Sequence, residues 1–194
     1  MNTYIETMKV VGGEIVNLEL HEERIFRTIG WIPKINKSLT SCSGTLKYRI
    51  TYNINGIISK ELTEYSIKPI GSLKLVMADS IDYSYKYLNR EVINSLMKKR
   101  GDADDIIIVK EGLITDTSYC NIVLENSNGL FTPSQPLLRG TKREFLIRTG
   151  IIKEKDISFS ELIGFDRIHL INAMIDLEDN IIIEKYRIDT GDIL

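Results

Sequence analysis

The spacing of apolar residues changes near residues 69–71 (Pro-Ile-Gly), and this change constrains the fold more than any other feature of the sequence. From Leu46 to Tyr52 every second residue is aliphatic or aromatic, which is the period of a half-buried strand. Residues 53–56 supply turn chemistry, so a second strand is expected over residues 57–65. From Leu88 to Met97 the apolar residues instead recur at near-helical spacing. Strand hairpins therefore precede mixed strands and helices, which predicts an α+β fold in two lobes.

Further elements can be assigned on each side of this break, which divides the chain into lobes 1–69 and 70–194. Before it, a hairpin over Tyr4–Val11 and Ile15–Leu18 is expected, followed by a short helix around His21–Thr28. After it, we expect strands over residues 73–77, 106–109, 122–124, 130–132, 167–171 and 181–188, a helix capped by Asn89, a helix from Thr141, and a Ser158-x-x-Glu161 capping box.

Composition and charge exclude several classes of protein. The 194 residues carry 25 basic and 27 acidic side chains, so no basic excess exists to neutralise a nucleic-acid backbone. No run of about 18 apolar residues could span a membrane, and the first residues lack the basic and apolar regions of a signal peptide. Cys42 and Cys120 are too few for a disulfide framework or a cysteine zinc site. We expect a soluble, cytoplasmic protein that binds neither nucleic acid nor membrane.

Histidines and the common catalytic and metal-binding motifs are scarce in the sequence. The surroundings of the two histidines predict His21 on the surface and His169 in the core, rather than in a catalytic triad. No Gly-x-Ser-x-Gly elbow, Gly-x-Gly-x-x-Gly turn or Walker loop is present. The acidic clusters at residues 102–105 and 176–179 lack the spacing of a calcium loop. We expect these carboxylates to cap or solvate the ends of elements, and we expect no metal site.

Three segments carry residue types that pyridoxal phosphate requires. Lys86 lies among tyrosines before a helix, and a lysine in a desolvated pocket loses its proton more readily and can form an imine with an aldehyde. A buried Asp116 could keep a pyridine nitrogen protonated, and Gly140 at a helix start would let backbone N–H groups approach a phosphate. Each residue has an alternative interpretation: a surface lysine, a turn-capping aspartate and an ordinary loop glycine.

Five segments of the chain carry a resemblance to known enzymes. They are Glu6-Thr7, His21-Glu22-Glu23-Arg24-Ile25, Tyr85-Lys86-Tyr87-Leu88-Asn89, the run from Asp116 to Arg143 with its Thr-Pro and Leu-x-Gly-x-x-Arg motifs, and Leu170-Ile171-Asn172-Ala173-Met174. Together they resemble the class IV, branched-chain and D-amino-acid aminotransferase-like family of pyridoxal-phosphate enzymes. The resemblance covers most of the chain, from Glu6 to about Glu178.

The resemblance implies a role for each matched residue. Lys86 would be the catalytic lysine that holds the cofactor covalently, Arg24 would hold its phosphate, and Asp116 would face its pyridine nitrogen. The implied cofactor-binding set is Arg24, Lys86, Asp116, Asn121, Gly140, Thr141, Lys142, Asn172, Ala173 and Met174. The resemblance also implies a fold-type-IV architecture of mixed and antiparallel sheets with helices, a cofactor in the cleft between the lobes, and a homodimer.

Within the family, the Asn172-Ala173-Met174 turn is similar to that of the aminodeoxychorismate lyase branch. This similarity implies 4-amino-4-deoxychorismate as the substrate, with pyruvate and 4-aminobenzoate as the products. One alternative is a class IV aminotransferase that uses the same residues on amino acids. Another is a degenerate family member that binds a ligand without catalysis.

The sequence also departs from the family pattern. Asp116 stands where the family has glutamate, which is one methylene longer. The strand from Leu46 to Asn53 corresponds to one that carries a substrate-binding arginine in the D-amino-acid branch, but Tyr52 occupies that place. Arg49 lies nearby on the opposite face by parity, and both residues stay candidates for substrate binding. The chain begins where the first family motif ends, so the strands that precede this motif are expected to be missing.

Overall fold

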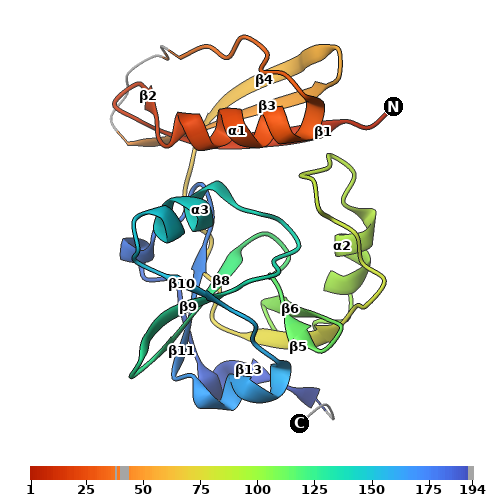
Figure 1. Cartoon of the computed structure of the whole chain (residues 1–194), viewed down its shortest axis with the longest axis vertical. Helices are drawn as coiled ribbons and strands as arrows, with labels where there is room; N and C mark the ends of the chain where they lie inside the picture. The colour runs from red at the N-terminus through yellow and green to blue at the C-terminus, as the bar shows by residue number, and fades with distance from the viewer. Residues whose placement is uncertain (38, 40–43, 192–194) are drawn as a thin grey trace. The chain divides into compact units, whose positions relative to one another are not determined.

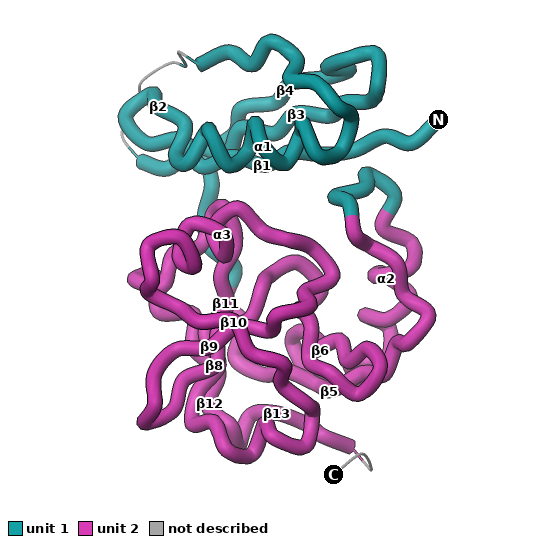
Figure 2. Tube along the Cα trace, in the orientation of Figure 1, with its two compact units in different colours: residues 1–68, 85–89 teal, residues 69–84, 90–194 magenta. Residues whose placement is uncertain are grey.

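The computed structural model describes residues 1–37, 39 and 44–191 and divides the chain into two compact units (Figure 1; Figure 2). Unit 1 comprises residues 1–68 and 85–89, and unit 2 comprises residues 69–84 and 90–194. The predicted division at Pro69 assigns residues 85–89 to the second lobe, whereas the structure places them in unit 1. They belong with unit 1 because the Ile5 N–H donates to the Lys86 carbonyl at 2.9 Å and the Leu88 N–H donates to the Thr3 carbonyl at 2.9 Å.

Unit 1 is an antiparallel sheet with one helix across one of its faces (Figure 1). Its strands lie in the order β2-β1-β3-β4. The elements are β1 (Tyr4–Val11), β2 (Glu14–Ile15), α1 (Leu18–Ile29), β3 (Thr45–Asn53) and β4 (Gly56–Glu64). The alternation predicted from Leu46 is confirmed, because the even-numbered side chains of β3 are buried in the core shared with α1. That core contains Met8, Val10, Ile25, Ile29, Ile35, Leu46, Tyr48, Ile50 and Tyr52.

The limits of α1 follow from local backbone chemistry. The helix begins at Leu18, earlier than predicted, directly after Asn17, whose φ of 53° turns the chain. It ends at Gly30, which has a φ of 83° and donates its N–H to the Phe26 carbonyl at 2.8 Å. A left-handed residue at this position is the common end of a helix, and glycine adopts it without a Cβ penalty.

The described residues of unit 2 form two sheets and two α-helices, with short 3-10 helices between strands. One sheet has the order β13-β5-β6-β7, and the other has the order β10-β9-β8-β11-β12. The elements are β5 (Leu73–Met77), α2 (Glu91–Met97), β6 (Asp105–Lys110), β7 (Leu113–Ile114), β8 (Asn121–Asn126), β9 (Gly129–Pro133), α3 (Thr141–Arg148), β10 (Lys153–Lys155), β11 (Arg167–Ile171), β12 (Ile182–Glu184) and β13 (Ile188–Asp189). The apolar run of β6 is fully buried beside the parallel strand β5, as expected for the interior of a sheet. The predicted α+β class is confirmed.

Two predicted elements of unit 2 differ in the structure. Asn89 does not cap α2, because residues 85–89 run extended beside β1 and the helix starts only at Glu91, after Arg90. The strand predicted over residues 181–188 is broken by a 3-10 turn at Lys185–Arg187. The break lets the chain leave β12 in one sheet and enter β13 in the other. The Ser158–Glu161 capping box is confirmed, and it opens a 3-10 helix over Phe159–Gly164.

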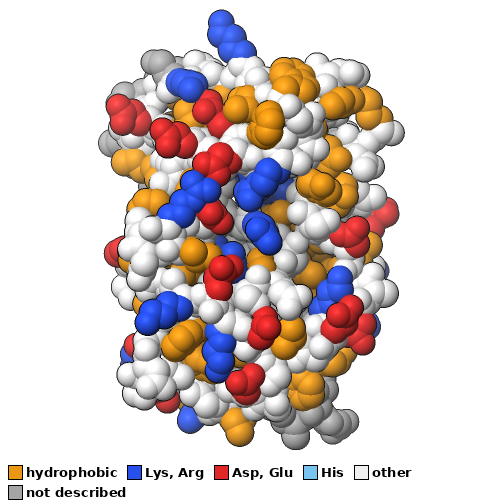
Figure 3. Space-filling view, viewed as in Figure 1, with side chains coloured by type: hydrophobic (Ala, Val, Ile, Leu, Met, Phe, Trp, Pro, Cys, Tyr) orange, Lys and Arg blue, Asp and Glu red, His pale blue; other side chains and the backbone are white. Residues whose placement is uncertain are grey.

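The described surface mixes charged and apolar side chains. Figure 3 shows Lys and Arg interspersed with Asp and Glu on the visible face. Large hydrophobic side chains of unit 1 also remain exposed, among them Phe26, Trp31, Ile32 and Ile58. Within the described residues, every helix is too short or too polar to cross a membrane.

Candidate functional site

Asp116 is the central residue of the candidate site in unit 2. It lies between β7 and β8 and is fixed at its backbone, where the Ile108 N–H donates to the Asp116 carbonyl at 2.8 Å. Its side chain is only 5% exposed. One carboxylate oxygen accepts from Asn121 Nδ2 at 2.7 Å, and the other accepts from the Leu138 backbone N–H at 2.9 Å. The structure therefore holds a buried carboxylate in a defined orientation.

The environment of Asp116 shifts its protonation. Burial raises the pKa of the Asp116 carboxyl to about 6, because a buried carboxylate loses its hydration. The hydrogen bonds from Leu138 and Asn121 and the positive charge of Arg143 oppose this shift and are outweighed. A nearby positive charge would return this carboxyl to its ionised form.

Asn121 connects Asp116 to the loop that precedes α3. Its Nδ2 donates to the Leu138 carbonyl at 2.9 Å in addition to Asp116. Gly140 lies directly against this amide, since a Cβ added to Gly140 would overlap Asn121 Oδ1. Gly140 therefore leaves room for the Asn121 side-chain amide against the start of α3.

Gly140→Ala is expected to destabilise the protein by about 1–3 kcal/mol through overpacking. The backbone at Gly140 suits alanine, with φ −70° and ψ 145°, so the cost arises from the overlap with Asn121. The free energy of unfolding in urea measures it. Asn121→Ala is the control background, because it removes the overlapping amide, and there Gly140→Ala should cost less than about 0.5 kcal/mol. An equal cost in both backgrounds would contradict this explanation.

The first residues of α3 include a threonine hydroxyl without a described partner and two basic side chains that form ion pairs. The Thr141 hydroxyl is buried and has no hydrogen-bond partner among the described residues. Lys142 pairs with Asp176 and lies over the Phe145 ring, 5.2 Å from its centroid. Arg143 donates to the Pro133 carbonyl at 2.7 Å and pairs with Glu154 at 2.6 Å. The structure therefore leaves the Thr141 hydroxyl and the backbone N–H groups of the first turn to bind an anion.

The turn at residues 172–174 contacts the same region of unit 2. Asn172 Oδ1 accepts from the Met174 backbone N–H at 2.8 Å, and its Nδ2 lies 3.2 Å from Cys120 Sγ. Cys120 is buried, forms no disulfide with a described residue and is next to Asn121 in the chain. Together with the Lys142–Asp176 pair, these contacts connect the three segments at residues 116–121, 138–142 and 172–176. Cys42 lies outside the described residues.

Unit 1 contains a buried charged cluster that the sequence did not predict. His21 Nδ1 lies 2.6 Å from Glu6 Oε1, and Arg24 donates through Nε to Glu6 Oε2 at 3.2 Å and through a second nitrogen to Oε1. All three side chains are buried, so the surface position predicted for His21 is wrong. The signal was available in the helix spacing, because residues three apart share a helix face and Arg24 lies on the buried face of α1.

The charges in this cluster control one another. Burial raises the pKa of Glu6, but the Arg24 charge and the His21 hydrogen bond outweigh it and lower the value to about 2. Burial lowers the pKa of His21, and the positive charges of Arg24 and Lys86 lower it further against the opposing effect of Glu6. Glu6 is therefore ionised and His21 neutral at neutral pH. Arg24 uses two of its five N–H donors on Glu6, so others are left for a ligand.

Lys86 lies in unit 1, in the extended segment that pairs with β1. Its side chain is half-buried, and its backbone carbonyl accepts from the Ile5 N–H at 2.9 Å. The flanking Tyr85 and Tyr87 pack with Tyr4, with ring centroids 6.1 and 5.4 Å from it. The backbone from which the Lys86 side chain extends is thus fixed by main-chain pairing and by aromatic packing.

The two candidate substrate residues lie on opposite faces of β3, as parity predicted. Tyr52 is fully buried in the core of unit 1, and burial together with the Glu6 charge raises the pKa of its hydroxyl above its ordinary value. Arg49 is half-buried and pairs in register with Thr7 and Glu61 on the neighbouring strands. The buried face of β3 therefore presents a tyrosine and no cation near Glu6.

The remaining candidates carry no site of their own. His169 is half-buried on β11, where its Nε2 lies 2.8 Å from Glu125 Oε2, so it is a paired strand residue and not a core one. Among the residues that the structure describes, no three His, Cys, Asp or Glu side chains are placed to share a metal ion. The candidate residues thus form two sets: Arg24, Arg49, Tyr52 and Lys86 in unit 1, and Asp116, Asn121, Gly140, Thr141, Lys142, Asn172, Ala173 and Met174 in unit 2.

Comparison with known proteins places the chain among related sequences and structures. The family model for amino-transferase class IV matches residues 83–177. An uncharacterized protein of Haemophilus influenzae is 33% identical over 186 residues, which span 90% of this chain and 98% of that protein.

Solved structures share the fold. A candidate 4-amino-4-deoxychorismate lyase from Haemophilus somnus superposes with a TM-score of 0.82 at 28% identity, covering 90% of this chain and 97% of that one. A hypothetical aminotransferase from Mycobacterium tuberculosis, solved in a form with bound pyridoxal phosphate, has a TM-score of 0.70 at 16% identity, covering 99% of this chain and 84% of that one. The sequence match and the shared fold together show that this chain belongs to the amino-transferase class IV family.

Proposed function

We propose that this protein is a pyridoxal-phosphate enzyme that releases pyruvate from 4-amino-4-deoxychorismate and leaves 4-aminobenzoate. The observation that carries the proposal is the buried carboxylate of Asp116, held by Asn121 and Leu138 beside the first turn of α3. The choice of reaction is supported by the similarity to the Haemophilus somnus candidate lyase, at 28% identity over 90% of this chain.

The residues of unit 2 fit a ligand that has both a ring nitrogen and a phosphate. Protein donors, Asn121 and Leu138 among them, take only part of the roughly four acceptor positions of Asp116, so it could also accept from a protonated ring nitrogen. The buried Thr141 hydroxyl without a partner among the described residues lies in the first turn of α3, whose N–H groups attract anions. A phosphate would satisfy both the hydroxyl and the helix end.

In this proposal each residue of the chain has a defined task. Bound pyridoxal phosphate would supply an electron sink for the bonds at the carbon that bears the substrate amino group. Lys86 holds the cofactor and then moves protons as general base and acid. Asp116 keeps the proton on the ring nitrogen, and the Thr141 hydroxyl with nearby N–H groups holds the phosphate. Arg24, oriented by Glu6, contributes its remaining donors to the phosphate charge.

The lyase reaction is favoured over transamination because β3 carries no cation on its buried face. A transaminase binds an α-carboxylate in both half-reactions, usually with a paired cation. On β3, Tyr52 occupies the buried face and Arg49 lies on the other face. No cation of this strand is therefore placed beside Glu6, where the family's D-amino-acid branch would use one.

The proposal predicts pyruvate release from aminodeoxychorismate by protein loaded with pyridoxal phosphate. Pyruvate is measured with lactate dehydrogenase and NADH, and 4-aminobenzoate is measured by chromatography. With alanine, glutamate or branched-chain amino acids and 2-oxoglutarate, we expect slow or no transamination. Rapid formation of 2-oxo acids from these amino acids would favour the aminotransferase alternative. A protein that stays colourless with added pyridoxal phosphate would favour the degenerate, non-catalytic one.

A further inference from the structure

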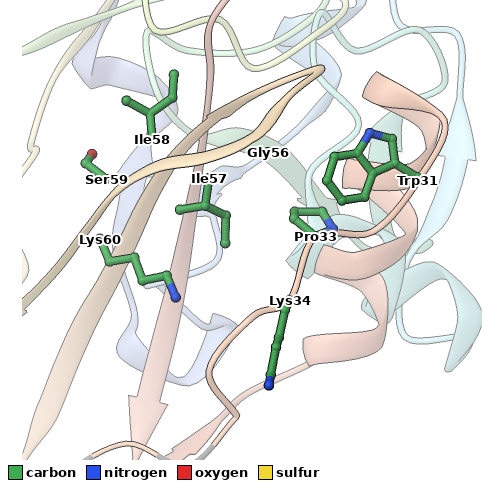
Figure 4. Close-up of a pocket in the computed structure, with 8 residues that line it drawn as sticks. All are labelled: Trp31, Pro33, Lys34, Gly56, Ile57, Ile58, Ser59 and Lys60. Carbon is green, nitrogen blue, oxygen red and sulfur yellow. The ribbon is translucent and has the colours of Figure 1, made fainter.

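A hollow lies in unit 1, and no candidate site residue described above is among the residues that line it. It is bordered by residues 31–34, which follow α1, and by residues 56–60 at the start of β4 (Figure 4). Its volume is about 480 Å³, and much of it is open to solvent. We call it the Trp31 groove. Its lining residues are Trp31, Pro33, Lys34, Gly56, Ile57, Ile58, Ser59 and Lys60.

Trp31 is held in place although it is 41% exposed. Its Nε1–H donates to the Ile54 carbonyl at 3.1 Å, which ties the indole to the β3–β4 turn. The ring also packs over Gly56, where an added Cβ would lie 3.5 Å from Cη2. Because its N–H is already paired, the indole offers only its aromatic surface to a ligand. A fixed, exposed aromatic surface can bind a flat apolar group without losing conformational entropy.

Two lysines give the groove its charge. Lys34 and Lys60 are exposed, and the ammonium group of neither forms an ion pair or hydrogen bond with a described residue. Lys37 close by, in contrast, pairs with Glu22 at 3.0 Å. Figure 4 shows Ile57 and Lys60 on one side of β4 and Lys34 on the loop across from them, with Trp31 beyond Pro33.

We propose that the Trp31 groove binds a small planar aromatic molecule that carries one anionic group, either a carboxylate or a phosphate. The ring would lie against Trp31, Pro33 and Ile57, and the anion would lie between the two ammonium groups. Apolar contact and paired cations are both needed, because an exposed lysine pair alone gives only weak attraction in water. The inference is independent of the proposed lyase activity, since no residue of that site lines the groove.

The test uses the fluorescence of Trp31, which is the only tryptophan in the chain. The protein, loaded with pyridoxal phosphate, is titrated separately with benzoate, AMP, neutral benzamide and inorganic phosphate. We expect a saturable change with benzoate or with AMP below about 10 mM, and a midpoint at least about tenfold higher for benzamide and for phosphate alone. Comparing benzoate with AMP identifies carboxylate or phosphate as the preferred anion.

Variants separate the groove from binding elsewhere on the protein. The double variant Lys34→Gln/Lys60→Gln should raise the midpoint of the titration at least about tenfold. The control double variant Lys99→Gln/Lys153→Gln removes two exposed charges of unit 2 and should leave the midpoint unchanged. Both double variants are expected to unfold at the wild-type urea concentration. The proposal is overturned if neither benzoate nor AMP gives a saturable change, if benzamide binds as tightly as benzoate, or if the unit 2 double variant weakens binding equally.

Discussion

Lys86→Ala is expected to lower turnover of aminodeoxychorismate by at least about 1,000-fold, within the range of roughly 10²–10⁴ for a lost general acid–base group plus the loss of covalent attachment. The side chain is the part that acts, because the backbone of Lys86 is engaged with the Ile5 N–H through its carbonyl. Alanine keeps that main-chain bond. The variant should therefore fold as stably as the wild type to within about 1 kcal/mol.

The bond to the cofactor can be located directly. After borohydride reduction of the loaded protein, peptide mapping should find the pyridoxyl group on Lys86. Lys74→Ala is the matched control, since Lys74 forms a partly exposed ion pair with Asp189 at 3.0 Å, and such pairs contribute at most about 1 kcal/mol. Its turnover and labelling should match the wild type. A pyridoxyl group on Lys142 or Lys74 would contradict the match of Lys86 to the catalytic lysine of the family, on which the other assignments depend.

A chemical-rescue measurement distinguishes the lost amine from a disturbed fold. Added methylamine should restore part of the activity of Lys86→Ala in a concentration-dependent way and should not affect Lys74→Ala. Rescue follows if the missing amine is the only defect, because a small amine can move the same protons. A variant that loses activity and also unfolds at lower urea would instead point to a structural role for Lys86.

The strands could be predicted closely because their signal is local. The limits of β1, β5 and β11 agree with the apolar patterns read from the sequence. The elements that differ are set by contacts far along the chain. Residues 85–89 pair with β1, which delays α2, and the end of the chain moves between sheets at Lys185–Arg187. No pattern within a short window contains either contact.

In the candidate site, too, contacts between residues close in sequence could be predicted and contacts between distant residues could not. Asp116 and Asn121 are five residues apart, and their bridge follows from a turn that the sequence suggested. The cluster of Glu6, His21 and Arg24 joins a strand to a helix over more than a dozen residues, and charge patterning alone placed His21 on the surface. The Lys142–Asp176 pair likewise needed the fold, because nothing in the sequence indicates which aspartate faces that lysine.

Asp116→Asn is expected to lower turnover by about 100-fold or more, the size typical of a lost preorganised electrostatic partner. The amide has nearly the same shape and can keep a hydrogen bond to the Leu138 N–H, but it carries no charge to hold a proton on the ring nitrogen. The cofactor should still bind with an altered visible spectrum. If Asp116 only capped its turn, the variant would lose at most about 1 kcal/mol of stability and keep its turnover.

The pH dependence of stability gives a second, independent readout of Asp116. Its folded pKa is raised from 3.8 to about 6, so the folded state without cofactor binds this proton more tightly than the unfolded state. The cost of burying the charge is fully present above pH 6 and disappears as the pH falls toward 3.8. Relative to Asp116→Asn, the wild type should gain up to about 3 kcal/mol between pH 7 and pH 4.

Cofactor should remove this dependence, and that response separates a ring-nitrogen partner from an aspartate that is merely buried. A protonated pyridine nitrogen beside Asp116 favours its ionised form and lowers its pKa, so the gain between pH 7 and pH 4 should shrink when pyridoxal phosphate is bound. Asp105 is the matched control, because it is also buried and burial raises its pKa, but its carboxylate accepts from the Ile106 and Ser118 backbone N–H groups. The difference between wild type and Asp105→Asn should have the same pH profile with and without cofactor. Two results together would show that Asp116 is not the partner of the ring nitrogen. The stability difference between wild type and Asp116→Asn would have the same pH profile with and without cofactor, and Asp116→Asn would turn over as fast as the wild type.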